Sequence, residues 1–134
     1  MPMFTSHSQK ILASVAVAIG AFASIVAIAG GSSTKDGAYT AEQAERGKGV
    51  YDKSCVNCHD EAFYRDKVAQ WENKPVGALF ESLAATMPAD NPGGLMTSEY
   101  VDVLAYIFSI TGSPAGKDEL NPDNMSTINV GAVQ

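Results

Sequence analysis

The two cysteines of the chain, Cys55 and Cys58, constrain its fold more than any other feature. They lie in the stretch SCVNCHD, residues 54–60, and His59 follows the second of them. Because the 134 residues contain no other cysteine, a disulfide framework is not available to stabilise the fold. Two thiols separated by two residues fit three kinds of site: a redox dithiol, half of a zinc site, or the attachment point of a haem.

The surroundings of the motif argue against zinc and against a dithiol. A zinc site needs four ligands, and the chain has no second cysteine pair and only one other histidine, His7. A thioredoxin-like dithiol follows a β-strand, whereas a glycine-containing helical stretch precedes Cys55. The sequence CVNCH matches the haem-attachment pattern C-x-x-C-H at every position. Its two thiols can each add to one vinyl group of the same porphyrin, while His59 is directed at the iron.

A long uncharged segment precedes the motif. No charged residue appears between Lys10 and Lys35, and about 20 apolar residues in a helix span a bilayer core of about 30 Å. Residues 1–31 are therefore predicted to be a membrane anchor, favoured by the length of the run, or a cleavable signal peptide with Ala27-Ile28-Ala29 at its cleavage site. Either one exports the rest of the chain, and haem attachment to such motifs takes place outside the cytoplasm.

The part of the chain after residue 31 is small and acidic. Roughly 100 residues bury only about 60–65% of the surface of the unfolded chain, so a large apolar cofactor would help to complete the core. This part carries 8 Lys and Arg against 15 Asp and Glu. The acidic balance repels phosphates and excludes a nucleic-acid partner.

The stretch GGSSTKDGAYT, residues 30–40, is rich in Gly, Ser and Thr, and residues 32–39 within it are predicted to be a flexible linker. A first helix is predicted from Ala41 to Lys53, with Thr40 as its N-cap and Gln43 completing a capping box. The interior of this helix contains glycine, which disfavours helix by about 1 kcal/mol. The two glycines are Gly47 and Gly49, and close approach of another helix is the usual reason for a glycine there.

Two more helices are predicted beyond the motif. Four apolar residues recur at helical spacing in the first of them: Val76, Leu79, Phe80 and Leu83. The second is SEYVDVLAYIFSI, capped by Thr97 or Ser98, with an apolar stripe that predicts burial against something large. The proline- and glycine-rich segment MPADNPGGL between them must be a loop. Residues 115–134 show no periodicity and are predicted to form an irregular tail that is surface-hugging or partly disordered.

Residues 40–114 form the predicted domain, and from about residue 44 they resemble a class I c-type cytochrome. TMPADNPGGL and EYVDVLAYIF are similar to segments of the small monohaem cytochromes that serve periplasmic dehydrogenases. The resemblance implies an all-α fold in which an amino-terminal helix crosses a carboxy-terminal one, with one haem in the crevice between them. Gly47 and Tyr51 match the crossing positions, with Ala105 or Tyr106 as contacts.

The resemblance also implies the site. Cys55 and Cys58 would bind one haem c covalently, His59 would be the proximal iron ligand, and Met87 of the TMP sequence would be the distal one. Met96 competes with Met87, because the stretch after His59 is short for the family. Pro88 favours Met87 by holding it in an extended loop.

Three other side chains are candidate haem contacts, and Met125, in the tail, is a further candidate ligand. Trp71 is expected either to donate to a haem propionate or to fill the crevice. Tyr64 has the same two interpretations as Trp71. Arg65 could neutralise a propionate, although the solvated surface is the expected place for it. Met125 is disfavoured as a ligand because it lies in an irregular segment.

These assignments predict an electron-transfer protein and not an enzyme. Iron bound by histidine and methionine has no position left for substrate, so it moves single electrons between redox partners. A dehydrogenase, an oxidase or another membrane complex is the expected partner, at the periplasmic side of the bacterial inner membrane. One alternative is a permanent cytochrome subunit of a respiratory, photosynthetic or dehydrogenase complex, docked through the anchor and the tail. Another is a haem sensor or enzyme with an open distal site.

Overall fold

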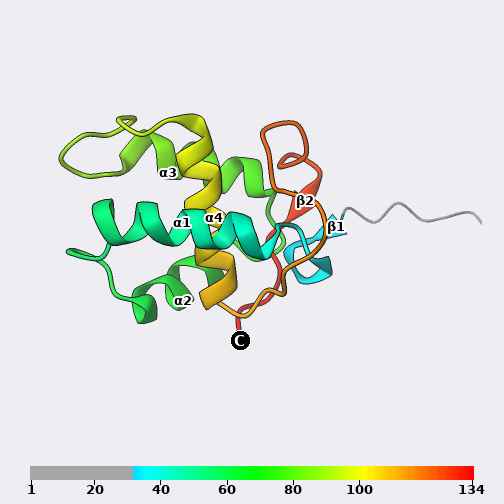
Figure 1. Ribbon diagram of the computed structural model, residues 1–134. Helices are drawn as coiled ribbons and strands as arrows, with labels where there is room; N and C mark the ends of the chain where they lie inside the picture. Colours follow the sequence, from blue (N-terminus) through cyan, green and yellow to red (C-terminus); the bar gives the residue numbers. More distant parts are fainter. Residues whose placement is uncertain (1–31) are drawn as a thin grey trace, which may run out of the picture.

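The computed structural model describes residues 32–134, and this part of the chain is mainly helical, as predicted (Figure 1). The predicted anchor or signal segment, residues 1–31, lies outside the described residues. Among residues 32–134 no helix combines the length and the apolar character needed to cross a membrane. The elements in chain order are β1 (Ser32–Ser33), a 3-10 turn (Thr34–Asp36), α1 (Ala41–Ser54), α2 (Glu61–Ala69), α3 (Val76–Thr86), α4 (Thr97–Ile110) and β2 (Ile128–Asn129).

Helix α1 begins where the sequence predicts it. The Thr40 hydroxyl accepts a hydrogen bond from the backbone N–H of Gln43 at 3.1 Å, which confirms Thr40 as the N-cap. The side chain of Gln43 does not complete a capping box. It is buried instead, and its amide bonds both backbone groups of Leu120 in the tail, at 2.8 and 2.9 Å.

Helices α1 and α4 cross in close contact at the centre of the domain (Figure 1). Gly47 lies at the crossing: a Cβ atom built on it would stand 1.8 Å from the carbonyl oxygen of Asp102. The prediction that a helix approaches this glycine is therefore confirmed. Tyr51, one turn further on, packs against Tyr106 with ring centroids 5.1 Å apart.

Helix α4 supplies most of the core, because eight of its fourteen residues are buried. The apolar stripe predicted from the sequence belongs to this buried set. Helix α3 packs beside α4, with Val76 fully buried and Leu79, Phe80 and Leu83 half-buried against the core. Leu79 and Leu83 also line the cavities described below.

The structure differs from the sequence-based expectation at both ends of the domain. Residues 32–39 are not a flexible linker: β1 pairs in parallel with β2, and the buried Tyr39 donates a hydrogen bond of 2.5 Å to the carbonyl of Ser113. The tail is irregular but packed, with Leu120 and Met125 buried. Partners far away in the sequence hold both segments, which is why local periodicity did not reveal their order.

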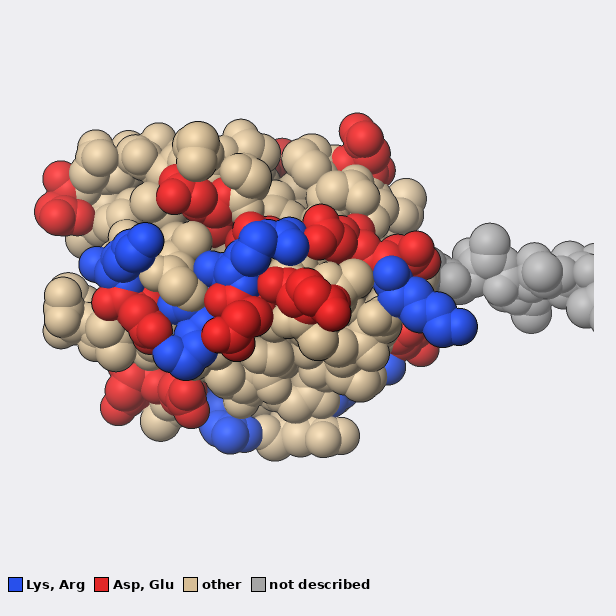
Figure 2. Space-filling view, in the orientation of Figure 1, with Lys and Arg blue, Asp and Glu red and all other residues tan. Residues whose placement is uncertain are grey.

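Charged side chains of both signs gather over the face that carries α1 (Figure 2). Arg46 of α1 contacts Asp102 of α4 through two bonds of 3.0 and 3.1 Å, and it also contacts Glu119 of the tail at 2.9 Å. This network connects three segments of the chain at the surface. Exposed ion pairs of this kind contribute about 1 kcal/mol at most.

Candidate functional site

The cysteine motif forms the turn between α1 and α2. Helix α1 ends at Ser54 with Cys55 as its C-cap, and the N–H groups of Cys58 and His59 both donate to the Cys55 carbonyl at 3.1 Å. Asp60 then caps α2. Two helix ends therefore fix the short segment that carries both thiols and the imidazole.

Met87 follows the last turn of α3, and its N–H donates to the Leu83 carbonyl at 2.8 Å. The loop that starts at Met87 continues to α4 at the same end of the molecule as the cysteine motif (Figure 1). The Tyr100 hydroxyl of α4 donates a hydrogen bond of 2.6 Å to the carbonyl oxygen of Met87. The residue predicted as the distal ligand is thus tied by its backbone to α3 and α4.

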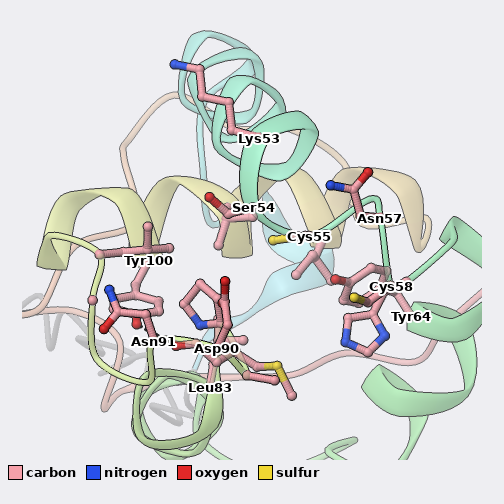
Figure 3. Close-up of a pocket in the computed structure, with 18 residues that line it drawn as sticks. Lys53, Ser54, Cys55, Asn57, Cys58, Tyr64, Leu83, Asp90, Asn91 and Tyr100 are labelled. Carbon is pink, nitrogen blue, oxygen red and sulfur yellow. Dashed lines mark hydrogen bonds between the residues drawn. The ribbon is translucent and has the colours of Figure 1, made fainter.

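A cavity of about 470 Å³ opens between the motif and this loop. Figure 3 shows Cys55 and Cys58 on one side of it, and Leu83, Asp90 and Tyr100 on the other. The four residues predicted as haem-binding all line this cavity: Cys55, Cys58, His59 and Met87. The sequence could predict their chemistry, but only the fold brings together segments about 30 residues apart.

A second cavity, of about 370 Å³, continues from the first towards α2 and α3. Five residues line both cavities: His59, Tyr64, Leu83, Met87 and Ile107. The second cavity also contains Phe63, whose ring stacks on the His59 imidazole with centroids 4.1 Å apart. His59 and Met87 therefore lie at the boundary of two adjoining spaces, and not at the edge of one.

The other methionines considered as ligands lie elsewhere. Met96 is 65% exposed, caps the start of α4 and lines neither cavity. The sequence placed the cap at Thr97 or Ser98, but the Met96 N–H donates to the Glu99 carboxylate at 2.8 Å. Met125 is a buried residue of the tail and lies outside both cavities.

Three side chains considered as haem contacts also have definite positions. Trp71 lines the second cavity, with the Lys74 ammonium 5.2 Å from its ring centroid. Arg65 is exposed, as expected, and contacts the backbone carbonyl of Gln134. Tyr64 is buried between α1 and the motif and lines both cavities, and its ring meets that of Tyr51 edge to face.

The Cys55 thiol does not have the surroundings of a reactive cysteine. Burial raises the pKa of the Cys55 thiol above its ordinary value, and an interaction with Tyr64 offsets only part of the effect. Cys55 also lies at the carboxy-terminal end of α1, where the helix dipole disfavours a thiolate. Among residues 32–134, no group of three or more His, Cys, Asp and Glu side chains is placed to hold a metal ion.

The chemistry of the cavity fits a covalently attached haem. It offers two thiols, one imidazole and one thioether, and the rest of its lining includes the apolar side chains of Leu83, Val103 and Ile107. Both cavities have volumes typical of cofactor sites, about 300–1,000 Å³. With both thiols used for thioether bonds, the imidazole and the Met87 thioether would remain as one nitrogen and one sulfur donor, which suit an iron whose other ligands come from a porphyrin.

Sequence reasoning missed the roles of two tyrosines. Tyr51 was identified as a helix-crossing residue, but its hydroxyl also donates to the carbonyl of His59 at 2.7 Å. Tyr100 was predicted only as part of α4. A signal was present in each case, because a tyrosine on a buried helix face needs a partner for its hydroxyl.

Comparison of the chain with protein-family models, with curated proteins and with solved structures found no match.

Proposed function

We propose that this protein is a monohaem c-type cytochrome that carries single electrons between redox partners on the periplasmic side of a membrane. The observation that carries the proposal is the cavity between α1, α3 and α4, because its lining includes both thiols, the imidazole and the Met87 thioether. These four groups come from two separate segments of the chain and face one space. No other residue is needed to attach a haem and to complete its iron coordination.

Each residue then has a definite task. Cys55 and Cys58 would hold the porphyrin through thioether bonds, and His59 and Met87 would ligate the iron. The apolar side chains of Leu83, Val103 and Ile107 line the cavity and would pack against the porphyrin. When bound, the haem supplies one-electron oxidation and reduction of its iron.

The position of the cavity supports transfer between proteins. The described chain begins at β1, at the opposite end of the molecule from the motif and the Met87 loop (Figure 1). An anchor ahead of residue 32 would leave the cavity end free to meet a redox partner. The tail, which was a candidate docking element for a permanent complex, is committed to the domain through Leu120 and Met125.

The test is attachment and redox chemistry of the full chain, exported in a bacterium that attaches haem to C-x-x-C-H motifs. The wild type is expected to retain one haem after denaturation and to titrate as a one-electron couple. The double variant Cys55→Ala, Cys58→Ala should lose the haem on denaturation, while Met96→Ala should keep it. A wild-type chain exported without haem, or one whose ferrous form binds carbon monoxide readily, contradicts the proposal.

A further inference from the structure

We propose that Tyr100 is a positioning residue for Met87, which keeps the thioether at the distal position of the haem. The inference rests on the proposed function and deepens it. Its basis is the 2.6 Å hydrogen bond from the Tyr100 hydroxyl to the Met87 carbonyl. The hydroxyl touches the backbone of the ligand residue, so Tyr100 acts through Met87 and not on the iron.

Tyr100 is well fixed in the fold. It lies in the first turn of α4 and is only 4% exposed. Its ring meets that of Phe80 of α3 edge to face, with centroids 6.2 Å apart and planes at 88°. Helix α4 also crosses α1 at the centre of the domain. The helix that carries the Tyr100 hydroxyl is therefore fixed by the core.

The loop that Tyr100 holds has few other connections. Two of its hydrogen bonds are internal, from Asn91 to the Pro88 carbonyl and from Gly94 to the Asn91 carbonyl, both at 2.9 Å. Among the hydrogen bonds of residues 32–134, only the bond from the Tyr100 hydroxyl joins segment 87–95 to α4. Most of this segment is exposed. Without the Tyr100 bond, the start of segment 87–95 is held by the hydrogen bond from the Met87 N–H to the Leu83 carbonyl at the end of α3.

The two proposed iron ligands therefore differ in how they are held. The His59 carbonyl accepts from Tyr51, but the His59 N–H also bonds the Cys55 carbonyl, and both neighbouring cysteines would be fixed by thioether bonds. Met87 has no covalent restraint on its loop. Displacement of a ligand should thus occur on the Met87 side, and Tyr100 should set how readily it occurs.

An external ligand that replaces Met87 measures this directly. The apparent affinity for such a ligand is its intrinsic affinity multiplied by the fraction of molecules in which the thioether has left the iron. Loss of a neutral hydrogen bond that holds the loop should raise that fraction about threefold to tenfold. The apparent affinity should increase by the same factor.

The experiment titrates imidazole into the oxidised, haem-loaded full chain and follows the loss of the methionine-to-iron absorption band. Tyr100→Phe should bind imidazole about three to ten times more tightly than the wild type. Tyr39→Phe is the matched control, because it removes a hydroxyl that donates a 2.5 Å hydrogen bond at the other end of α1. Its imidazole affinity should remain that of the wild type, although its thermal stability should fall.

Two outcomes separate this inference from the proposed function. If the wild type lacks the methionine-to-iron band, the ligation itself is wrong. If the band is present and Tyr100→Phe binds imidazole no more tightly than Tyr39→Phe, the hydroxyl only stabilises the fold, and the positioning role is overturned.

Discussion

Replacement of Gly47 by alanine is expected to destabilise the domain, whereas the same change at Gly49 is expected to stabilise it. Both glycines lie inside α1, so both gain helix propensity, about 1 kcal/mol, on replacement by alanine. The surroundings differ completely. A Cβ on Gly49 meets nothing within 4 Å, while one on Gly47 would stand 1.8 Å from the carbonyl oxygen and 2.4 Å from the carbonyl carbon of Asp102.

The magnitude follows from this overlap. Restoring ordinary contact requires α1 and α4 to separate by roughly 1.5 Å, and the neighbour that must move is helix backbone, which cannot rotate away as a flexible side chain can. Overpacking of a core costs about 1–3 kcal/mol, occasionally more, and the crossing of α1 and α4 lies at the upper end. After the gain in propensity is subtracted, Gly47→Ala should lose about 2 kcal/mol of unfolding free energy.

The assay is thermal and denaturant unfolding of the full chain, wild type against the two variants. A loss of about 2 kcal/mol lowers the Tm of a domain of this size by roughly 8–16 °C. Gly49→Ala should raise the Tm by a few degrees. If Gly47→Ala is as stable as the wild type, or if the two variants shift together, the close helix crossing at Gly47 is refuted.

Two further changes test how the tail and the surface hold the domain. Gln43→Leu leaves the buried N–H and carbonyl of Leu120 without partners and should cost about 2 kcal/mol or more, measured by unfolding and by faster hydrogen exchange in the tail. The exposed Glu45→Leu is its control and should change stability by no more than about 0.5 kcal/mol, and equal effects would contradict the role of Gln43. Arg46→Ala should cost at most about 1 kcal/mol at low ionic strength and less at 1 M salt, where screening acts over about 3 Å. A cost that does not change with salt would argue against an electrostatic contribution.

The parts of the fold that the sequence predicted are those with local signals. Thr40 caps α1 through a neighbour three residues away, and the stripe on α4 repeats at helical spacing. The helix cost of Gly47 and Gly49 called for a reason at both positions, and only the resemblance singled out Gly47. Helix α2 was not separately predicted, since it is short and buries only Tyr64 and Val68.

The ends of the domain could not be predicted from local patterns. Strand β1 pairs with β2 across nearly the whole described chain, and each has only two residues. Gln43 looked like a capping residue, yet its amide binds the tail through contacts that no periodicity encodes. Loops and short strands of this kind take their order from tertiary hydrogen bonds.

The candidate site shows the same division. The chemistry of Cys55, Cys58 and His59 is contained in five consecutive residues, and the sequence identified it. The choice between Met87 and Met96 depends on which one the chain carries to the motif, and the structure puts Met87 on the cavity and Met96 in solvent. The hydroxyls of Tyr51 and Tyr100 needed the structure, because their partners are backbone carbonyls of other segments.

The most direct test of the account is the near-infrared spectrum of the oxidised, haem-loaded full chain, compared between the wild type, Met87→Ala and Met96→Ala. The account predicts a methionine-to-iron band in the wild type and in Met96→Ala, and its loss in Met87→Ala. A band that persists in Met87→Ala, or a wild-type spectrum without it, would contradict the proposed ligation and the role as a closed, single-electron carrier.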